Sequence, residues 1–461
     1  MTIELSNLTF TDQDDIVPLS GVERILNTGA ANTLAGNDTI TGIYNYKNDN
    51  SYPSGVDGIY NSGTLNTADG NDIITGHTGM SGFGIYNYET GTFNTGEGND
   101  IIDAKGGEIS IYNTGTFNTG EGNDIITVNG SSGGNTAATG ISTSGTFNMG
   151  EGNDTITAYA PINAIYTTGS FNTAEGDDVI IGEAFFYEGI LIGGGIFDTG
   201  NGNDRISGIN RFISLGTPGI SNDSTFNTGD GNDTIEGTGG SGINNAGLMN
   251  TGNGKDIIIA IQPYKGGSAI ENSSTINTGN DDDIITANDE INNYGNIDLG
   301  DGNDTITNMG TIYNEGIINT GNGNDSIIVD RGDNPDTTPG IYNNGGTINM
   351  GNGNDSIITN QDIWSGQNSS GACFLGEGDD YIKGFGSGDF YGGNGNDTLE
   401  LTPGIYTVGI WGEEGESPIF TNQNTRGFQG LMITSEFEKL KAGDTIYDFT
   451  SLTAGQIITV A

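Results

Sequence analysis

The chain has few of the residues on which most enzymes and nucleic-acid-binding proteins depend. Its 461 residues include one cysteine (Cys373), one histidine (His77) and 12 lysines and arginines against 60 aspartates and glutamates. A single cysteine excludes an intramolecular disulfide framework. The formal net charge of −48 excludes a basic nucleic-acid-binding face and disfavours docking to anionic membranes. The same charge favours multivalent cations as partners.

Long hydrophobic runs are also missing. The chain begins MTIELSNLTF, without a basic start or an apolar segment, so we expect no cleavable signal peptide. No apolar run approaches the length of a membrane span, and direct membrane insertion is not expected. By these signs alone the protein would be soluble and cytoplasmic.

What the chain does contain is a repeat built on glycine, of which there are 82 residues. The segment TFNTGEGNDII occupies residues 92–102 and recurs letter for letter at residues 116–126. Its core is Asn-Thr-Gly-x-Gly-Asn-Asp-x-Ile. Glycines at alternate positions allow a tight turn with positive φ, and the next two residues restart a strand with one buried side chain. The Asp at the exit of the turn directs a carboxylate toward the turn carbonyls.

Counting from this Asp gives a fixed frame. An apolar residue recurs two positions after it, another seven before it (Phe93, Phe117) and a third thirteen before it (Ile111, Ile141). Three inward residues in separate short segments predict a three-sided coil that buries its core only by stacking on its neighbours. The candidate metal ligands are the motif aspartates Asp38, Asp72, Asp100, Asp124, Asp154, Asp178, Asp204, Asp233, Asp256, Asp283, Asp304, Asp325, Asp355, Asp380 and Asp397.

The predicted fold class is therefore all-β: a right-handed parallel β-helix or β-roll solenoid of about fifteen coils with a non-repeat C-terminal cap. The predicted divisions are an N-terminal cap (1–24), solenoid repeats (25–360), β-roll-like repeats (361–400) and a C-terminal cap (401–461). Within this last region we expect a short helix around 435–441. Most insertions fall in one link per coil, which predicts a single loop-bearing edge.

Asparagine recurs eleven and six residues before the Asp, as at Asn113 and Asn118. Stacked identical amides can bond along a column, so we interpret both sets as structural ladders. The recurring Thr-x-Asn resembles the ranks of ice-binding solenoids. The Thr rank is interrupted by Ile196, Leu248, Asn296 and Ile317, which disfavours that function.

Residues 392–400, GGNGNDTLE, match the nonapeptide Gly-Gly-x-Gly-x-Asp-x-U-x, in which U is a large apolar residue. The chain thereby resembles the RTX (repeats-in-toxin, hemolysin-type) calcium-binding proteins. The resemblance implies a β-roll whose turns hold Ca²⁺ through aspartates and carbonyls, and secretion by the type I route with an uncleaved signal in 401–461. It therefore places the protein outside the cell or on its surface. The chain departs from the family pattern, since most repeats lack the first Gly and the motif occurs once per coil.

Electrostatics also favour calcium. Carboxylates stacked about 4.8 Å apart repel by roughly 1 kcal/mol per neighbour even in water, and Ca²⁺ accepts six to eight oxygen ligands. The alternative is that each Asp only caps its own turn. We expect weak links where Asp281 and Asp282 replace Gly and Asn, and where Lys255 precedes Asp256.

Three function classes follow. The first is a secreted calcium-binding structural or adhesive protein, which folds on calcium and is not an enzyme. The second is a carbohydrate-active solenoid, such as a polysaccharide lyase or epimerase, and the third is a non-catalytic secretion or targeting module. Besides calcium ions, the expected partners are a surface polysaccharide or further copies of the chain.

Overall fold

A computed structural model of the chain describes residues 2–18, 24–44, 57–79, 81–130, 138–212, 216–264, 267–332, 339–364, 371–412, 417–422 and 430–461. The chain divides into two compact units, Met1–Thr251 and Gly252–Ala461. Most of the longest predicted link loops, including residues 45–56, lie outside the described residues.

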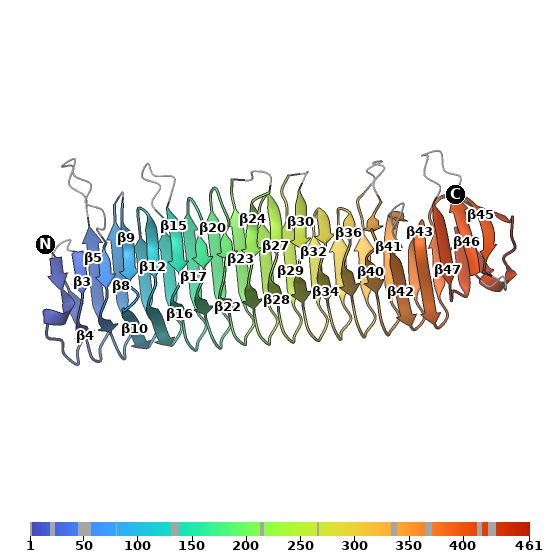
Figure 1. Cartoon of the computed structure of the whole chain (residues 1–461). Helices are drawn as coiled ribbons and strands as arrows, with labels where there is room; N and C mark the ends of the chain where they lie inside the picture. The colour runs from blue at the N-terminus through green and yellow to red at the C-terminus, as the bar shows by residue number, and fades with distance from the viewer. Residues whose placement is uncertain are drawn as a thin grey trace. The chain divides into compact units, whose positions relative to one another are not determined.

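In the N-terminal unit, each coil contributes one strand to each of three columns, and the strands within a column run parallel (Figure 1). The column that follows the motif aspartates contains β2 (Ile16–Val17), β5 (Thr39–Tyr44), β8 (Ile73–Thr78), β11 (Ile101–Lys105), β14 (Ile125–Asn129), β17 (Thr155–Ala160), β20 (Val179–Ala184), β23 (Arg205–Asn210) and β26 (Thr234–Thr238). The second contains β1 (Thr2–Glu4), β3 (Arg24–Asn27), β6 (Ile59–Asn61), β9 (Phe83–Asn87), β12 (Ile109–Asn113), β15 (Thr139–Thr143), β18 (Ile165–Thr167), β21 (Ile190–Ile192), β24 (Pro218–Asn222) and β27 (Ser241–Asn245). The third, which leads into the motif turn, contains β4 (Ala30–Asn32), β7 (Thr64–Asn66), β10 (Thr92–Glu97), β13 (Thr116–Glu121), β16 (Thr146–Asn148), β19 (Ser170–Asn172), β22 (Ile196–Asp198), β25 (Thr225–Asn227) and β28 (Leu248–Asn250).

The C-terminal unit continues the same three-strand pattern. Its repeating strands are β29 (Ile257–Ile261), β30 (Ser268–Asn272), β31 (Thr275–Asn277), β32 (Ile284–Ala287), β33 (Glu290–Asn293), β34 (Asn296–Asp298), β35 (Thr305–Asn308), β36 (Ile312–Asn314), β37 (Ile317–Asn319), β38 (Ser326–Val329), β39 (Ile341–Asn343) and β40 (Thr347–Asn349). In the last coils neighbouring segments merge into longer strands: β41 (Ser356–Trp364), β42 (Ala372–Glu377), β43 (Tyr381–Asn394) and β44 (Thr398–Leu401).

The chain ends in a cap that contains antiparallel strands. Strand β45 (Gly404–Trp411) pairs antiparallel with β46 (Ser417–Asn422) and with β50 (Ile457–Val460). Strands β47 (Leu431–Ser435) and β48 (Lys439–Ala442) add a last parallel layer to β43 and β44, and β49 (Thr445–Asp448) pairs antiparallel with β48. The only helices among the described residues are two 3₁₀ turns, η1 (Leu5–Asn7) and η2 (Phe449–Ser451).

The core of the N-terminal unit contains columns of apolar side chains in which the same residue type often recurs from coil to coil. Phe93, Phe117, Phe147 and Phe171 stack face to face, with ring centroids 4.5–4.9 Å apart and planes within 4° of parallel. All four are fully buried. Because a coil is one strand spacing thick, a side chain in the same frame position meets its counterpart in the next coil.

The asparagine columns are confirmed as hydrogen-bonded ladders. In the set that contains Asn113, called the inner column, the Asn61 amide donates to Asn87, and Asn87 donates to Asn113, at 2.8 and 2.9 Å. In the set that contains Asn118, called the outer column, Asn118 donates to Asn94 at 2.6 Å. Each amide therefore binds adjacent coils together in register.

The predicted all-β parallel solenoid is confirmed. Thirteen successive sets of three strands, from β3–β5 to β39–β41, carry the regular repeat. The predicted total of about fifteen coils counted every motif Asp, and the last two of these residues, Asp380 and Asp397, lie where the strands have merged. The predicted helix around 435–441 is wrong, because β47 ends at Ser435, Glu436 turns at φ +61° and β48 begins at Lys439. Leu440 lies in register beside Leu399, so stacking on the preceding coil overrides the local helix propensity.

Candidate metal centre

The motif turn places each Asp at the point where a strand of the third column gives way to one of the first. In the coil of β10 and β11, Gly98 has φ +137°, and a Cβ there would lie 1.8 Å from the carbonyl oxygen of Gly70 in the preceding coil. Only glycine allows the turns to stack this closely. The turn delivers Asp100 to the interior side of the coil, where it is 1% exposed.

One oxygen of each motif carboxylate joins a ladder that crosses the coils. The backbone N–H of Asp72 donates to Oδ1 of Asp100, and that of Asp100 donates to Oδ1 of Asp124, each at 2.8 Å. The same contact, at 2.7–2.8 Å, joins consecutive motif aspartates from Asp38 to Asp233 in the N-terminal unit. In the C-terminal unit it runs from Asp256 to Asp397. One oxygen of each motif carboxylate therefore accepts a backbone N–H from a neighbouring coil, and not from its own turn as the capping alternative expects.

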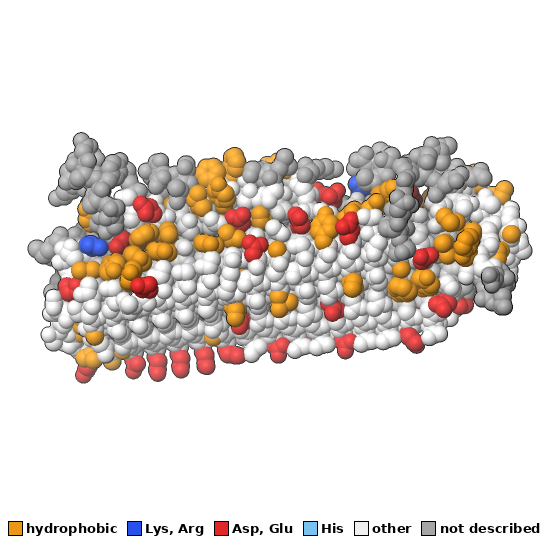
Figure 2. Space-filling view, in the orientation of Figure 1, with side chains coloured by type: hydrophobic (Ala, Val, Ile, Leu, Met, Phe, Trp, Pro, Cys, Tyr) orange, Lys and Arg blue, Asp and Glu red, His pale blue; other side chains and the backbone are white. Residues whose placement is uncertain are grey.

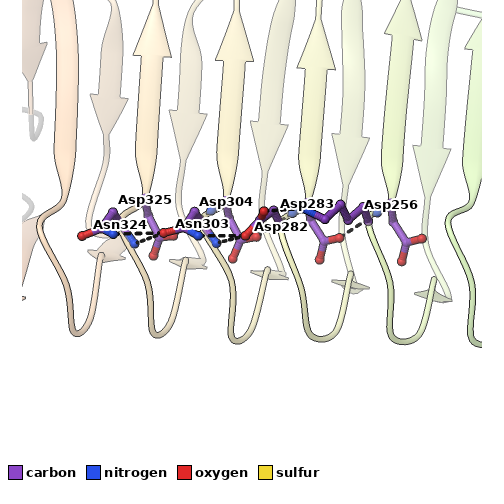
Figure 3. A network of polar contacts seen from close by, with 8 residues as sticks. Asp256, Asp282, Asp283, Asn303, Asp304, Asn324 and Asp325 are labelled. Atoms are coloured by element: carbon purple, nitrogen blue, oxygen red, sulfur yellow. Dashed lines mark hydrogen bonds and ion pairs between the residues drawn. The ribbon is translucent and has the colours of Figure 1, made fainter.

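The second carboxylate oxygen, Oδ2, is buried and has no hydrogen-bond partner. This holds for thirteen of the fifteen predicted ligands: Asp38, Asp72, Asp100, Asp124, Asp154, Asp178, Asp204, Asp283, Asp304, Asp325, Asp355, Asp380 and Asp397. Figure 3 shows four motif aspartates of the C-terminal unit, Asp256, Asp283, Asp304 and Asp325, pointing the same way into successive turns. A buried carboxylate oxygen without a partner is costly unless a proton or a cation meets it.

Burial is the main influence on these groups. Desolvation, with smaller contributions from the charges of neighbouring motif aspartates, raises the pKa of Asp100 to about 7 and that of Asp154 to about 8. In the C-terminal unit the pKa of Asp283 rises to about 8 for the same reasons. The turn interior therefore disfavours an ionised column that has no counterion.

The donor set fits a hard cation that accepts neutral oxygens beside few carboxylates. Among the described residues, no three His, Cys, Asp or Glu side chains gather closely enough to hold a metal ion. Each turn instead offers one buried carboxylate beside the carbonyl oxygens of the stacked turns, and most turns add a buried threonine hydroxyl, in a column that repeats coil by coil. Calcium takes such oxygen ligands, whereas zinc and other soft ions favour nitrogen and sulfur.

Two members of the column are absent from the sequence prediction. Asp15, two residues before Val17, donates its N–H to Oδ1 of Asp38 at 2.8 Å. At the other end Glu438, two residues before Leu440, accepts the N–H of Asp397 at 2.7 Å. Both keep the spacing of a carboxylate two residues before a buried aliphatic residue, but neither follows Gly-x-Gly. The acid-x-aliphatic pattern alone could have identified them.

The coil predicted to be a weak link has local compensation. Asp281 adopts φ +83° in the place of glycine. Asp282 forms an ion pair with Lys255 and accepts the backbone N–H of Asn303 at 2.9 Å (Figure 3). The hydrogen bond from Lys255 is the main cause that lowers the pKa of Asp282. Asp282 therefore takes the place of the Asn that precedes the motif Asp in most other turns. In one of these turns, for example, Asn99 donates its N–H to Oδ1 of Asn71 at 2.7 Å.

The outer edge of the turns in the N-terminal unit is acidic. Figure 2 shows acidic side chains following one another along one edge, at its left end. The exposed residues at the tips of successive turns are Asp69, Glu97, Glu121, Glu151 and Glu175. This row lies outside the turns, whereas the motif aspartates lie inside, so the two sets of carboxylates have different surroundings.

The single cysteine and the single histidine both lie in strands. Cys373 is a buried free cysteine in β42, beside Phe390. His77 lies in β8, with Nε2 3.0 Å from Oδ2 of Asp103.

The Thr-x-Asn rank faces outward, and three of its members are apolar and exposed. Ile196, Leu248 and Ile317 are 42–49% exposed in positions that other coils fill with Thr. None of the helices among the described residues is long and apolar enough to cross a membrane.

No family model matches the chain, and no curated protein is significantly similar to it in sequence. Among solved structures, it is similar to the crystal structure of a hyperactive, Ca²⁺-dependent, β-helical antifreeze protein from an Antarctic bacterium. The identity is 17%, the alignment covers 96% of each chain and the TM-score is 0.36.

Proposed function

We propose that this chain is an extracellular solenoid that binds calcium along its column of motif aspartates and serves, without catalysis, as a structural or adhesive protein. The observation that carries the proposal is the buried Oδ2 atom without a partner, repeated in coil after coil. A single such atom could be a local defect. Its recurrence at one frame position points to a common occupant.

The charges of the protein support a divalent cation as that occupant. The chain has 12 lysines and arginines against 60 acidic residues. Arginine side chains of the described residues form ion pairs with acidic residues at the surface. For example, Nη2 of Arg205 lies 3.5 Å from Oε2 of Glu236. Calcium supplies two charges per ion, and binding to the folded state alone stabilises that state by mass action. Aspartates of the column would hold the ion through Oδ2, while Oδ1 keeps the backbone ladder.

The location outside the cell follows from the same chemistry. Low calcium inside a cell leaves the acidic column unneutralised, and higher calcium outside allows the coils to stack. The secretion route by a C-terminal signal rests on the resemblance of residues 392–400 to RTX repeats.

The tyrosines favour a non-catalytic role. A uronate lyase or epimerase needs a base in a cleft that binds the acid. Here Tyr86 stacks on Tyr112 and Tyr313 on Tyr342, with centroids 5.0 Å apart in both pairs. Desolvation raises the pKa of Tyr86 to about 12, which makes it a poor source of phenolate. We therefore interpret the tyrosines as a feature of the repeat.

A calcium titration followed by circular dichroism and hydrogen exchange tests the proposal. We expect protection of the strand amides to rise with calcium and to collapse in excess chelator, with magnesium much less effective. The variant Asp100→Asn/Asp124→Asn should bind less calcium, because an amide keeps the ladder acceptor but loses the charge. Glu97→Gln/Glu121→Gln changes the same charge on the outer edge and should bind calcium normally inside the turns. Equal protection of the wild-type chain in chelator and in calcium would contradict the proposal.

The adhesive role is tested separately. A glycan array probed with the calcium-loaded chain should show binding that chelator abolishes. If the chain folds in calcium but binds no glycan, the adhesive role is contradicted and the structural role remains. Turnover of a uronate polymer would overturn the non-catalytic assignment.

A further inference from the structure

A buried threonine recurs beside the motif carboxylate, five residues before it in the chain. Thr95 precedes Asp100 and Thr119 precedes Asp124, and both threonines are fully buried. At the equivalent position of a coil without threonine, a Cβ added to Gly392 would lie 2.9 Å from Oδ2 of Asp397, so a side chain at this position faces the motif carboxylate. This residue is a Gly in the nonapeptide at 392–400, so the hydroxyl belongs to the other coils of this chain and not to that repeat.

The hydrogen of the hydroxyl is already in use. Oγ1 of Thr95 donates to the carbonyl oxygen of Thr119 at 2.8 Å, and Oγ1 of Thr67 donates to that of Thr95 at 2.9 Å. A threonine hydroxyl has one hydrogen and two acceptor lone pairs. The hydroxyl can therefore offer only lone pairs to Oδ2 of its aspartate. Two buried acceptors that face each other need a positive group between them.

Other coils lack this oxygen. The residue five before the motif Asp is Met149 for Asp154, Leu299 for Asp304, Met350 for Asp355, Leu375 for Asp380 and Gly392 for Asp397. All four of the apolar side chains among them are fully buried or nearly so. In the N-terminal unit only Met149 interrupts the threonines, whereas four of the five interruptions lie in the C-terminal unit.

We infer that the threonine hydroxyls are calcium ligands, and that the chain therefore contains two classes of calcium site: tight sites in coils with Thr and weaker sites in coils with Met, Leu or Gly. The inference rests on the proposed function, because it assigns residues to the same column. It implies that most of the sites that fill first as calcium rises lie in the N-terminal unit, whereas four of the five weaker sites lie in the C-terminal unit.

Calcium binding by the full chain, measured by equilibrium dialysis and titration calorimetry, tests the assignment. The variant Thr67→Val/Thr95→Val/Thr119→Val removes three hydroxyls at nearly constant volume. We expect its three coils to lose affinity by about 10-fold or more, as the loss of groups that support a metal commonly does. The matched control is Thr64→Val/Thr92→Val/Thr116→Val, which makes the same changes on the outward side of the same coils and should bind as wild type. Replacing the inner three by Ser should restore binding.

A gain of ligand gives a second test that does not depend on a weakened fold. Met149→Thr places a hydroxyl where the neighbouring coils have Thr119 and Thr173, and it should convert one weak site into a tight one. The control Met149→Val introduces a side chain of nearly the same volume as threonine but without the hydroxyl, and it should leave the site weak. Equal calcium binding by the inner and outer valine variants, or by Met149→Thr and Met149→Val, would overturn the assignment. Absence of calcium binding by the wild-type chain would instead refute the proposed function itself.

Discussion

Asn308 and Asn293 place the same side chain in two different buried surroundings. Asn293 belongs to the inner ladder, where its amide donates to Asn314 at 2.8 Å and to the carbonyl of Ile317 at 2.9 Å. Asn308 is fully buried in the strand after Asp304, and neither its amide nitrogen nor its amide oxygen has a partner. Its in-register neighbours are Ala287 and Val329. Asn308 is therefore an asparagine, the residue that forms the ladder elsewhere, in a column whose neighbouring side chains are apolar.

Asn308→Val should raise the free energy of unfolding by about 1–3 kcal/mol, because it removes a buried amide without hydrogen bonds from a site where Val329 shows that valine fits. Urea unfolding in saturating calcium measures the change. Asn293→Val is the matched control and should destabilise the chain, since it leaves the ladder partners unsatisfied. A change of the same sign in both variants would contradict this reading of the two environments.

At the scale of the element, the motif turn depends unequally on its two glycines. The position of Gly96 is filled in other coils by Leu34, Ala68 and Ala174, each with φ between +67° and +71°. The position of Gly98 is glycine in nearly every turn, at φ +137° in this one. That angle is one that side chains with a Cβ rarely adopt. The second glycine is thus the stricter requirement.

Gly98→Ala should cost about 2–4 kcal/mol, from backbone strain together with the clash of its Cβ against the preceding turn. Gly96→Ala should cost less, because Ala68 is accommodated at the equivalent position. Chemical unfolding in calcium compares the two. Equal losses of stability in the two variants would show that the contact with the preceding turn, and not the backbone angle φ, determines the need for glycine.

At the scale of the whole molecule, the buried carboxylates link stability to pH. Their folded-state pKa values of about 6 to 8 lie above the ordinary value of 3.8, as for Asp72, Asp178 and Asp304. At a pH between the ordinary pKa and the folded-state pKa, the folded chain binds more protons than the unfolded chain. The free energy of unfolding therefore falls as pH rises through this range. Burial is the first cause in every case.

In chelator, the melting temperature should therefore be highest near pH 4 and fall progressively toward pH 8. In saturating calcium the trend should flatten or reverse, because protons compete with the ion for the same carboxylates. Thermal melting across this range, with and without calcium, measures both curves. A chelated chain that is most stable at pH 8 would contradict the buried, unpaired state of the column.

The sequence by itself determined the fold class, the three-strand coil, the core columns and the identity of the motif aspartates. It could do so because every coil repeats one frame, and each position in the frame has one neighbour above and one below. Its error at residues 435–441 arose where the frame lacks Gly-x-Gly, so local helix propensity was the remaining signal. Asp15 and Glu438 were missed for the same reason.

Only the tertiary structure decided what each atom of the turn does. That one oxygen of Asp100 accepts a backbone N–H while the other is buried without a partner depends on the stacking of adjacent coils. The use of the Thr95 hydroxyl hydrogen on a carbonyl of the next coil is likewise a contact between coils. A repeat pattern specifies which residues stack, because it fixes the register. The direction of each donor and acceptor follows only when the coils are placed against one another.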